Sequence, residues 1–126
     1  RMKKYEKMKK HIENNFEMIK IYGKKSSKNL IIGWGSTKSA ILDATEELDC
    51  KFMQILYAKP LSPKVKKEMQ KADNIILVEN NQTGQMGRLL REKTGIRVDK
   101  KNRILKYDAR PFWTDELKTQ IQKRLK

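Results

Sequence analysis

The chain has 126 residues, with 30 Lys or Arg against 15 Asp or Glu, a formal net charge of +15, one His and one Cys. This length suits one domain with a hydrophobic core and is too short for two. The single cysteine excludes an internal disulfide and any cysteine-only metal site and favours a cytoplasmic location, while no apolar run approaches the roughly 20 residues of a membrane span.

The positive charge invites a nucleic-acid interpretation. The basic residues are spread along the whole chain and mixed with acidic ones, however, and no RNA-binding signature of basic and aromatic residues is present. A lysine-rich proteome or a thermophilic source would produce the same balance. We therefore expect neither a nucleic-acid partner nor a membrane partner.

Residues 1–26 are predicted to form a basic linker helix followed by a polar turn. Tyr5, Met8, Ile12 and Phe16 recur at helical spacing within a Lys-rich stretch, which gives a narrow apolar stripe. Because the chain does not begin with Met, we expect the helix to lead in from a missing upstream domain, although removal of a tag would leave the same start. A frayed terminus is the alternative to an ordered helix. Residues 17–22 fit either a helix end or a short edge strand.

Residues 27–126 are predicted to form one α/β domain. Apolar runs over 30–32, 52–57, 75–78 and 104–107 indicate strands, and helical stripes follow each of them. Ser36, Ser62 and Thr114 are candidate helix N-caps, and Gly95 is a helix stop. The inward helical stripes are Ala40 or Ile41, Ala44 and Leu48; Val65, Met69 and Ala72; Met86, Leu89 and Leu90; and Leu117, Ile121 and Leu125. This alternation predicts an α/β sandwich with a mostly parallel sheet.

Two polar turns follow the most apolar strands, where ligands and partner surfaces usually lie in open α/β sheets. The first consists of Gly33, Trp34, Gly35, Ser36 and Thr37, and the second contains Glu79, Asn80, Asn81, Thr83, Gly84 and Gln85. The glycine turn before a helix suits an anion. It lacks the third glycine of a dinucleotide fingerprint and the lysine of a nucleoside-triphosphate loop.

Few residues are candidates for catalysis. His11 is the only histidine and lies in the basic leader, so a Ser-His-Asp or Cys-His arrangement would have to reach back to it, and Cys50 is typical of a small packing residue. Glu79 could act as an acid or base, although we favour a role in accepting hydrogen bonds from the N–H groups of its turn. Trp34 and Trp113 are candidates for either surface anchors or core residues. The residues alone therefore predict a non-catalytic domain with a sheet-edge surface.

Three segments together carry a family resemblance. They are Gly33-Trp34-Gly35-Ser36-Thr37, Glu79-Asn80-Asn81-Gln82-Thr83-Gly84-Gln85 and Tyr107-Asp108-Ala109-Arg110-Pro111-Phe112. In order and spacing, from about residue 30 to 117, the chain resembles the C-terminal domain of the alpha subunit of 2-oxoacid:ferredoxin oxidoreductases, most closely the 2-oxoglutarate branch. The resemblance implies the transketolase C-terminal-domain fold, a three-layer α/β/α sandwich with about five strands. Pro60-Leu61-Ser62-Pro63 and Ala109 depart from the family pattern.

The resemblance implies a complex that decarboxylates 2-oxoglutarate or a related 2-oxoacid, such as pyruvate, to an acyl-CoA. Thiamine diphosphate, Mg²⁺, iron–sulfur clusters and CoA are implied for the whole complex, and none is expected to bind here. The implied partners are other alpha-subunit domains, a thiamine-binding beta subunit and, through the complex, ferredoxin. The two turns, with Arg110, are the expected interface. A stand-alone module for a phosphorylated ligand or nucleic acid is the alternative.

Overall fold

The short apolar runs predicted as strands pair into one sheet. The computed structural model describes residues 2–81, 84–106 and 112–126. Its strands are β1 (Ile19–Gly23), β2 (Asn29–Trp34), β3 (Lys51–Ile55), β4 (Asn74–Glu79) and β5 (Arg103–Leu105), in the order β1-β3-β2-β4-β5. Among the strands of the described residues, only the β1–β3 pair is antiparallel. The mostly parallel sheet is therefore confirmed, and residues 17–22 contribute an edge strand rather than a helix end.

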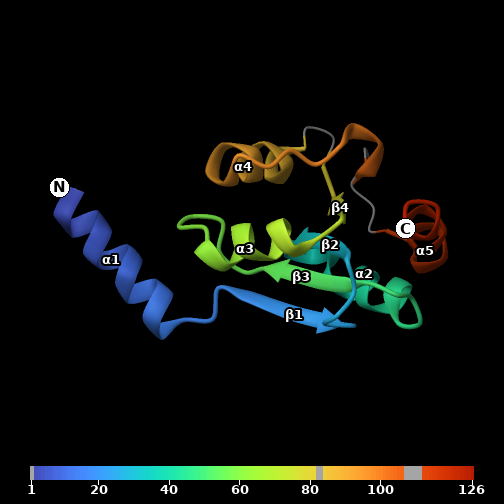
Figure 1. Cartoon of the computed structure of the whole chain (residues 1–126), viewed down its shortest axis with the longest axis horizontal. Helices are drawn as coiled ribbons and strands as arrows, with labels where there is room; N and C mark the ends of the chain where they lie inside the picture. The colour runs from blue at the N-terminus through green and yellow to red at the C-terminus, as the bar shows by residue number, and fades with distance from the viewer. Residues whose placement is uncertain (1, 82–83, 107–111) are drawn as a thin grey trace.

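The helices that cover the sheet lie on both of its faces, so the expected three-layer sandwich is confirmed (Figure 1). The α-helices are α1 (Met2–Asn15), α2 (Lys38–Thr45), α3 (Pro63–Lys71), α4 (Gln85–Thr94) and α5 (Thr114–Gln122). Two short 3-10 helices, η1 (Gly35–Thr37) and η2 (Lys100–Asn102), precede α2 and β5. Helices α3 and α4 pack on one face of the sheet, and α2 and α5 pack on the other.

Consecutive apolar residues in the central strands serve opposite faces of the sheet. Leu30 and Leu77 belong to the core under α3 and α4, whereas Ile31 and Ile76 belong to the core under α2 and α5. All four are at most 1% exposed. Burial of both faces explains why these strands read as unbroken apolar runs rather than as alternating ones. Most predicted inward residues are buried as well: Ile41, Ala44, Val65, Met69, Met86, Leu90, Leu117 and Ile121.

Of the four helix caps and stops predicted from the sequence, the structure confirms two and contradicts two. Ser62 caps α3, because its Oγ accepts a hydrogen bond from the Lys64 N–H at 3.2 Å, and Gly95 ends α4 at a φ of +76°. Ser36 is not a cap: η1 intervenes, and α2 begins after Thr37. The prediction for Thr114 is also wrong, since Trp113 occupies the N-cap position of α5.

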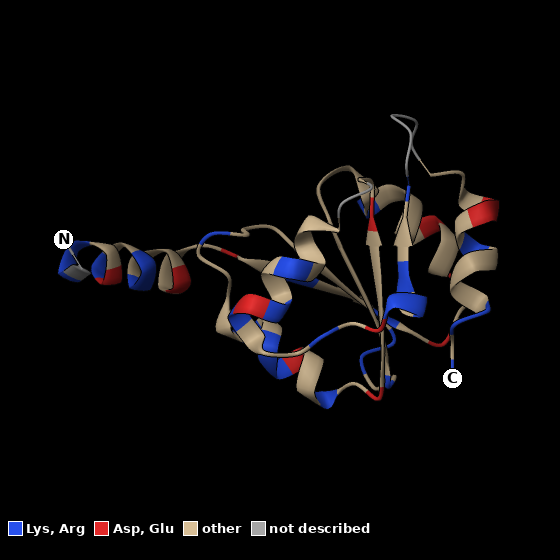
Figure 2. Ribbon diagram, turned by 90° about the horizontal axis from the view of Figure 1, so that it is seen from above, with Lys and Arg blue, Asp and Glu red and all other residues tan. Residues whose placement is uncertain are grey.

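Helix α1 projects from the sandwich rather than packing in its layers (Figure 2). Strand β1, which falls inside the expected linker range 1–26, instead pairs with β3 along its whole length. Within the described ranges, no helix combines the length and the apolarity needed to cross a membrane.

Candidate functional site

The two predicted turns lie side by side at one edge of the sheet. Strands β2 and β4 pair in parallel, from Asn29 with Asn74 to Ile32 with Leu77, so their carboxyl ends meet. The turn over 33–37 comprises the last two residues of β2 and η1, and the second turn begins at Glu79, the last residue of β4. We call these two turns the carboxyl edge. Thr83 and Arg110 lie outside the described residues.

Glu79 is completely buried and organises the second turn. Its Oε1 accepts hydrogen bonds from the Met86 N–H at 2.7 Å and from Asn81 Nδ2 at 3.1 Å, and its Oε2 accepts one from the Gly87 N–H at 3.2 Å. These backbone donors belong to the first turn of α4, where unpaired N–H groups attract a negative charge. The hydrogen-bonding role predicted for Glu79 is confirmed, and its carboxylate is engaged within the chain.

Two further features hold the described residues on either side of the second turn, Asn81 and Gly84. Asn81 Oδ1 accepts a hydrogen bond from the Gly84 N–H at 2.8 Å. Gly84 then adopts a left-handed conformation with a φ of +64°, which glycine reaches without steric cost. Asn80 Oδ1 is buried and accepts no hydrogen bond from any described residue. Hydrogen bonds therefore link Glu79, Asn81 and Gly84, while the side-chain oxygen of Asn80 has no hydrogen-bond partner among the described residues.

The first turn owes its shape to close packing of α2 on β2. A Cβ atom at Gly33 would collide with Ile41 Cδ1 and would lie 3.0 Å from Thr37 Oγ1. The Thr37 hydroxyl donates to the Trp34 carbonyl at 2.8 Å and fixes the turn. Gly35 has a φ of +62° with open space around it, and Ser36 is exposed. Gly35 and Ser36 are thus the accessible part of this turn.

A surface hollow of about 420 Å³ joins the two turns. Trp34, at the end of β2, forms one wall, and Gln85 and Met86, at the start of α4, form another. Trp34 also packs partly against the core, so it is half-buried rather than a fully exposed anchor. Residues that sequence analysis did not propose for the site complete the lining: Ala58, Lys59, Arg88, Leu89, Glu92 and Lys93. The hollow combines an aromatic wall with cationic side chains.

Neither remaining candidate nucleophile or base reaches the carboxyl edge. His11 is exposed on α1, where Asn15 Nδ2 lies 3.2 Å from its Nδ1. Cys50 is 2% exposed just before β3, at the amino end of that strand. Burial, reinforced by the charge of Asp49, raises the pKa of the Cys50 thiol to about 11. The packing role predicted for Cys50 agrees with this environment.

We expect Cys50 to resist alkylation in the folded protein. With a pKa of about 11, roughly one thiol in a thousand is ionised at pH 8, against about one in four for a free thiol of ordinary pKa. Iodoacetamide labelling, followed by mass spectrometry, should be more than about 100-fold slower than for free cysteine, and should reach the free rate in denaturant. Labelling of the native chain at the free rate would contradict this environment.

At the opposite end of the sheet, three buried asparagines form a chain of hydrogen bonds that sequence analysis missed. Asn74 Nδ2 donates to Asn29 Oδ1 at 2.9 Å, and Asn102 Nδ2 donates to Asn74 Oδ1 at 2.9 Å. We call these three residues the asparagine ladder. Asn74 Nδ2 also donates to the Arg124 carbonyl at 2.7 Å, and Asn29 Nδ2 donates to that of Lys126 at 3.0 Å. The ladder thus attaches the end of the chain to the sheet.

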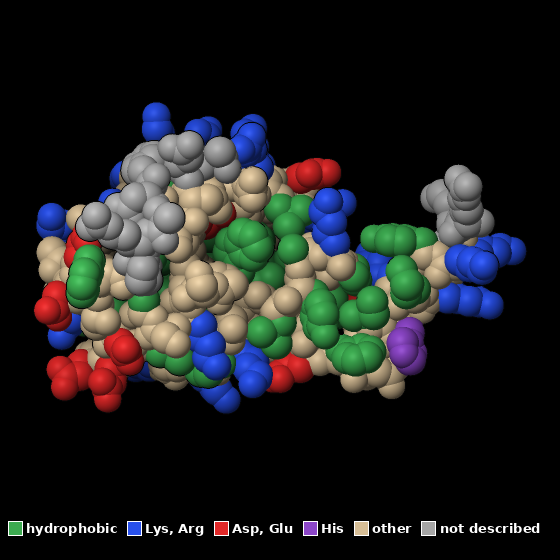
Figure 3. All heavy atoms as spheres, turned by 180° about the vertical axis from the view of Figure 1, so that it is seen from behind, with side chains coloured by type: hydrophobic (Ala, Val, Ile, Leu, Met, Phe, Trp, Pro, Cys, Tyr) green, Lys and Arg blue, Asp and Glu red, His purple; other side chains and the backbone are tan. Residues whose placement is uncertain are grey.

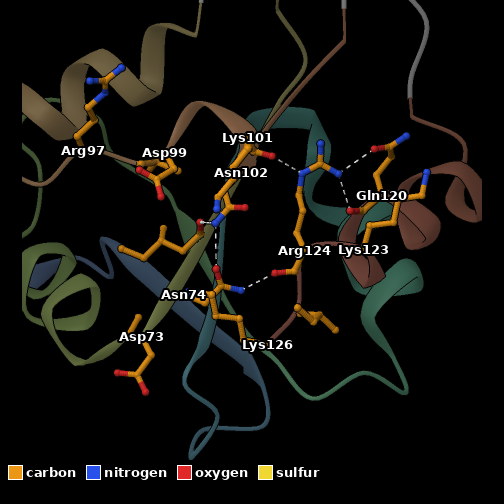
Figure 4. A pocket seen from close by; sticks show the side chains of 14 residues that line it. Asp73, Asn74, Arg97, Asp99, Lys101, Asn102, Gln120, Lys123, Arg124 and Lys126 are labelled. Carbon is orange, nitrogen blue, oxygen red and sulfur yellow. Dashed lines mark hydrogen bonds between the residues drawn. The ribbon is translucent and has the colours of Figure 1, made fainter.

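A hollow of about 680 Å³ lies beside this ladder (Figure 4). Its lining mixes basic and acidic side chains, namely Asp73, Arg97, Asp99, Lys101, Lys123, Arg124 and Lys126. The Arg124 guanidinium donates to the carbonyls of Lys101 and Gln120, both at 2.7 Å. These N–H groups of Arg124 are therefore already hydrogen-bonded to the backbone of the chain. One sequence signal for this region existed: an Asn stands at or immediately before the start of β2, β4 and β5.

No group of three or more His, Cys, Asp or Glu side chains among the described residues is arranged to hold a metal ion. An iron–sulfur cluster needs several thiolate ligands, whereas the sequence offers only the buried Cys50. The residues of this chain therefore do not fit a cluster.

No protein-family model matches the chain. It is 42% identical over 130 aligned residues to the alpha subunit of 2-oxoacid:ferredoxin oxidoreductase 1 from Sulfurisphaera tokodaii, an alignment that covers the whole chain and 20% of that subunit. It is 41% identical to the Saccharolobus solfataricus alpha subunit, over 82% of the chain and 17% of that subunit. The chain thus spans about a fifth of the length of these curated relatives.

Two solved structures are similar in fold. The 2-oxoglutarate:ferredoxin oxidoreductase of Magnetococcus marinus, solved with 2-oxoglutarate, coenzyme A and succinyl-CoA bound, superposes with a TM-score of 0.80 at 19% identity, over 93% of this chain and 21% of that chain. The alpha chain of a probable 2-oxoacid ferredoxin oxidoreductase from Thermoplasma acidophilum gives a TM-score of 0.56 at 29% identity, over 84% of this chain and 95% of that one.

The fold is thus the transketolase C-terminal-like sandwich implied by the sequence. The chain is homologous to about a fifth of the alpha subunit of 2-oxoacid:ferredoxin oxidoreductases, a subunit of oxidoreductase complexes.

Proposed function

We propose that the chain is a non-catalytic assembly domain within the alpha subunit of a cytoplasmic 2-oxoacid:ferredoxin oxidoreductase. The observation that carries the proposal is the 42% identity to such an alpha subunit along the whole chain. Its partners would be the other domains of that subunit and a thiamine-binding beta subunit, with ferredoxin as the acceptor served by the complex. Thiamine diphosphate, Mg²⁺, the clusters and CoA would bind elsewhere in the complex.

The local chemistry supports a non-catalytic role. Glu79, the one buried acid at the carboxyl edge, already accepts three hydrogen bonds. A general base must reach the substrate proton with a free acceptor, and a nucleophile must be ionised and accessible. Cys50 is neither ionised nor accessible. The exposed part of the edge, with Trp34 beside a cation-lined hollow, is better suited to contact with a protein surface.

Within this proposal, the carboxyl edge is the interface and α1 is the linker helix. The edge residues proposed for contact are Gly33, Trp34, Gly35, Ser36, Thr37, Glu79, Asn80, Asn81, Thr83, Gly84, Gln85 and Arg110. Glu79, Gly33 and Thr37 would act by shaping the turns, because they are buried. Trp34, Ser36 and Gln85 are at least partly accessible and would touch the partner directly.

For the substrate, we propose 2-oxoglutarate, because the Gly33-Trp34-Gly35-Ser36-Thr37 turn resembles that branch. The solved structure with 2-oxoglutarate bound supports this choice only through its similar fold. Dye reduction driven by 2-oxoglutarate and CoA tests both the assembly role and the choice of substrate. The assay uses the full parent subunit co-expressed with its thiamine-binding partner, with and without residues 27–126.

Loss of activity on truncation is expected, and a panel of pyruvate and branched-chain oxoacids then identifies the substrate. If another oxoacid is preferred, the 2-oxoglutarate proposal fails and the assembly role survives. If none of the oxoacids tested supports dye reduction by the intact parent complex, the proposed function fails. RNA binding at moderate salt would instead favour a nucleic-acid module.

The Gly84→Val substitution should disrupt the carboxyl edge. A β-branched residue at a φ of +64° is strained by about 1–3 kcal/mol. A Cβ atom there would already lie 3.8 Å from Glu79 Oε2, and the two valine methyl groups would crowd that carboxylate further. We expect the yield of assembled complex, measured by size-exclusion chromatography, to fall about tenfold, which corresponds to about 1.4 kcal/mol of lost interaction.

Gly95→Val is the matched control for Gly84→Val. Gly95 has a φ of +76° and no atom within 4 Å of an added Cβ, at the opposite end of α4 from the carboxyl edge. It should suffer the same backbone strain without altering the edge. An unchanged yield for Gly84→Val, or an equal loss for both variants, would count against the edge as the assembly surface.

A further inference from the structure

The large hydrophobic side chains that remain exposed gather in one region. Among the described residues there are six of them, and Trp113 is the only one outside this region. The others are Tyr5, Met8 and Phe16, on or just after α1, and Leu56 and Tyr57, just after β3. Figure 3 shows hydrophobic surface over the body of the molecule and along the projecting helix on the same side. Grouped apolar exposure of this kind marks an interaction site, whereas scattered exposure does not.

Helix α1 is tied to the sandwich mainly near its end. Phe16 packs edge-to-face on Tyr57, with ring centroids 6.5 Å apart. Before that point, a hollow of about 440 Å³ lies between α1 and the 58–66 segment, with Tyr5 and Pro60 in its lining. A helix of 14 residues is marginal in water without tertiary contacts. The apolar side chains of α1 before Phe16, such as Tyr5 and Met8, are therefore exposed and give the helix little tertiary stabilisation.

The region extends without a break to the carboxyl edge. The hollow beside α1 and the hollow beside Trp34 share Ala58, Lys59 and Lys93 in their linings. We define the α1 face as the surface formed by Tyr5, Met8, Phe16, Trp34, Leu56 and Tyr57. The charged residues along it are mostly basic: Lys9, Lys59, Lys66, Arg88 and Lys93 stand against Glu13 and Glu92. Its complement is an apolar surface with an acidic rim.

We propose that the α1 face docks on the remaining part of the same alpha subunit, through an apolar patch rimmed by Asp or Glu. This inference rests on the proposed function, because it places the chain within a longer subunit. The relatives are about five times as long as the segment they share with this chain. A covalently linked partner needs little intrinsic affinity, because its effective concentration is high. A high effective concentration is compatible with docking through a face whose apolar side chains are already partly buried.

A second copy of the chain fits this face less well. Pairing two copies through α1 would place two Lys-rich helices together, in a chain whose net charge is +15. Like charges opposed across an interface are destabilising. The acidic complement must therefore come from a different surface.

Oxidative footprinting of the full-length alpha subunit in its complex tests the docking. Met8 is 55% exposed in this chain, whereas Met18 is 5% exposed and supplies an internal reference. If the α1 face is covered, peroxide should oxidise Met8 at least about tenfold more slowly than the same methionine in the unfolded subunit. Oxidation of Met8 at the unfolded rate would overturn the proposal.

A charge scan on α1 supplies the second measurement. Met8→Glu places a carboxylate within the apolar stripe, and Asn14→Glu adds the same charge at an exposed position outside the stripe. We expect Met8→Glu to reduce the yield of assembled complex about tenfold and Asn14→Glu to leave it unchanged. Equal yields would overturn the proposal. So would protection of Met8 that appears only with a doubled mass of the subunit, since that result would assign the face to a second copy.

The footprint does not depend on turnover, so the two proposals can fail separately. Slow oxidation of Met8 in a complex with no 2-oxoacid-dependent dye reduction would retain the docking face and reject the activity. Rapid oxidation of Met8 in an active complex would reject the docking face alone.

Discussion

Glu79→Ala is expected to lower the free energy of unfolding by about 3 kcal/mol, because buried donors would lose a charged acceptor. The carboxylate accepts hydrogen bonds from the N–H groups of Met86 and Gly87 and from the Asn81 amide. Water cannot replace it easily, since Glu79 is 0% exposed. Urea denaturation of the 126-residue chain, followed by circular dichroism, measures the loss.

Two further substitutions serve as comparisons for Glu79→Ala. Glu79→Gln keeps one acceptor oxygen but turns an amide N–H₂ towards backbone N–H groups, so we expect an intermediate loss. Glu92→Ala removes an exposed acid from the same region, with a change within about 0.5 kcal/mol. If Glu79→Ala were as mild as Glu92→Ala, the second turn would not depend on the buried carboxylate.

Asn74→Ala should cost about 3 kcal/mol as well, because it removes the centre of the asparagine ladder. Asn74 donates to Asn29 Oδ1 and to the Arg124 carbonyl, and accepts from Asn102 Nδ2. All three ladder residues are buried, so their lost partners are not replaced at the surface. Urea denaturation gives the stability change, and hydrogen exchange should show faster exchange in residues 121–126.

Asn14→Ala is the control for the ladder, because Asn14 is an exposed asparagine on α1. It should change stability by less than about 0.5 kcal/mol. If Asn74→Ala lowered stability without faster exchange at residues 121–126, the ladder would stabilise the sheet without attaching the end of the chain. If neither quantity changed, the ladder would have no energetic role.

The fold could be predicted from local patterns because the apolar composition of the central strands indicates that both of their faces are buried. Leu30, Ile31 and Ile32 form a run of branched apolar residues that is typical of a strand covered on both faces, and the structure buries all three. The Ser62 cap followed from the neighbouring Pro63 at the first helical position. The role of Glu79 also followed from its place between an apolar run and a helix start.

Other features depended on contacts that a sequence pattern does not contain. Ser36 resembled a cap, but the Thr37 hydroxyl donates to the Trp34 carbonyl and the intervening 3-10 turn delays α2. The asparagine ladder joins positions 45 and 28 residues apart, so it emerges only once the strand register is fixed. The hollow beside Trp34 likewise depends on how the 58–59 segment approaches α4.

The mass of the assembled complex is the most direct test of the assembly role. The full-length alpha subunit and the same subunit lacking residues 27–126 would each be co-expressed with the thiamine-binding partner and weighed by light scattering. An assembly domain predicts the full complex with the intact subunit and separate subunits with the truncated one. A complex that forms in equal yield without residues 27–126, lighter only by their own mass, would contradict the assembly role.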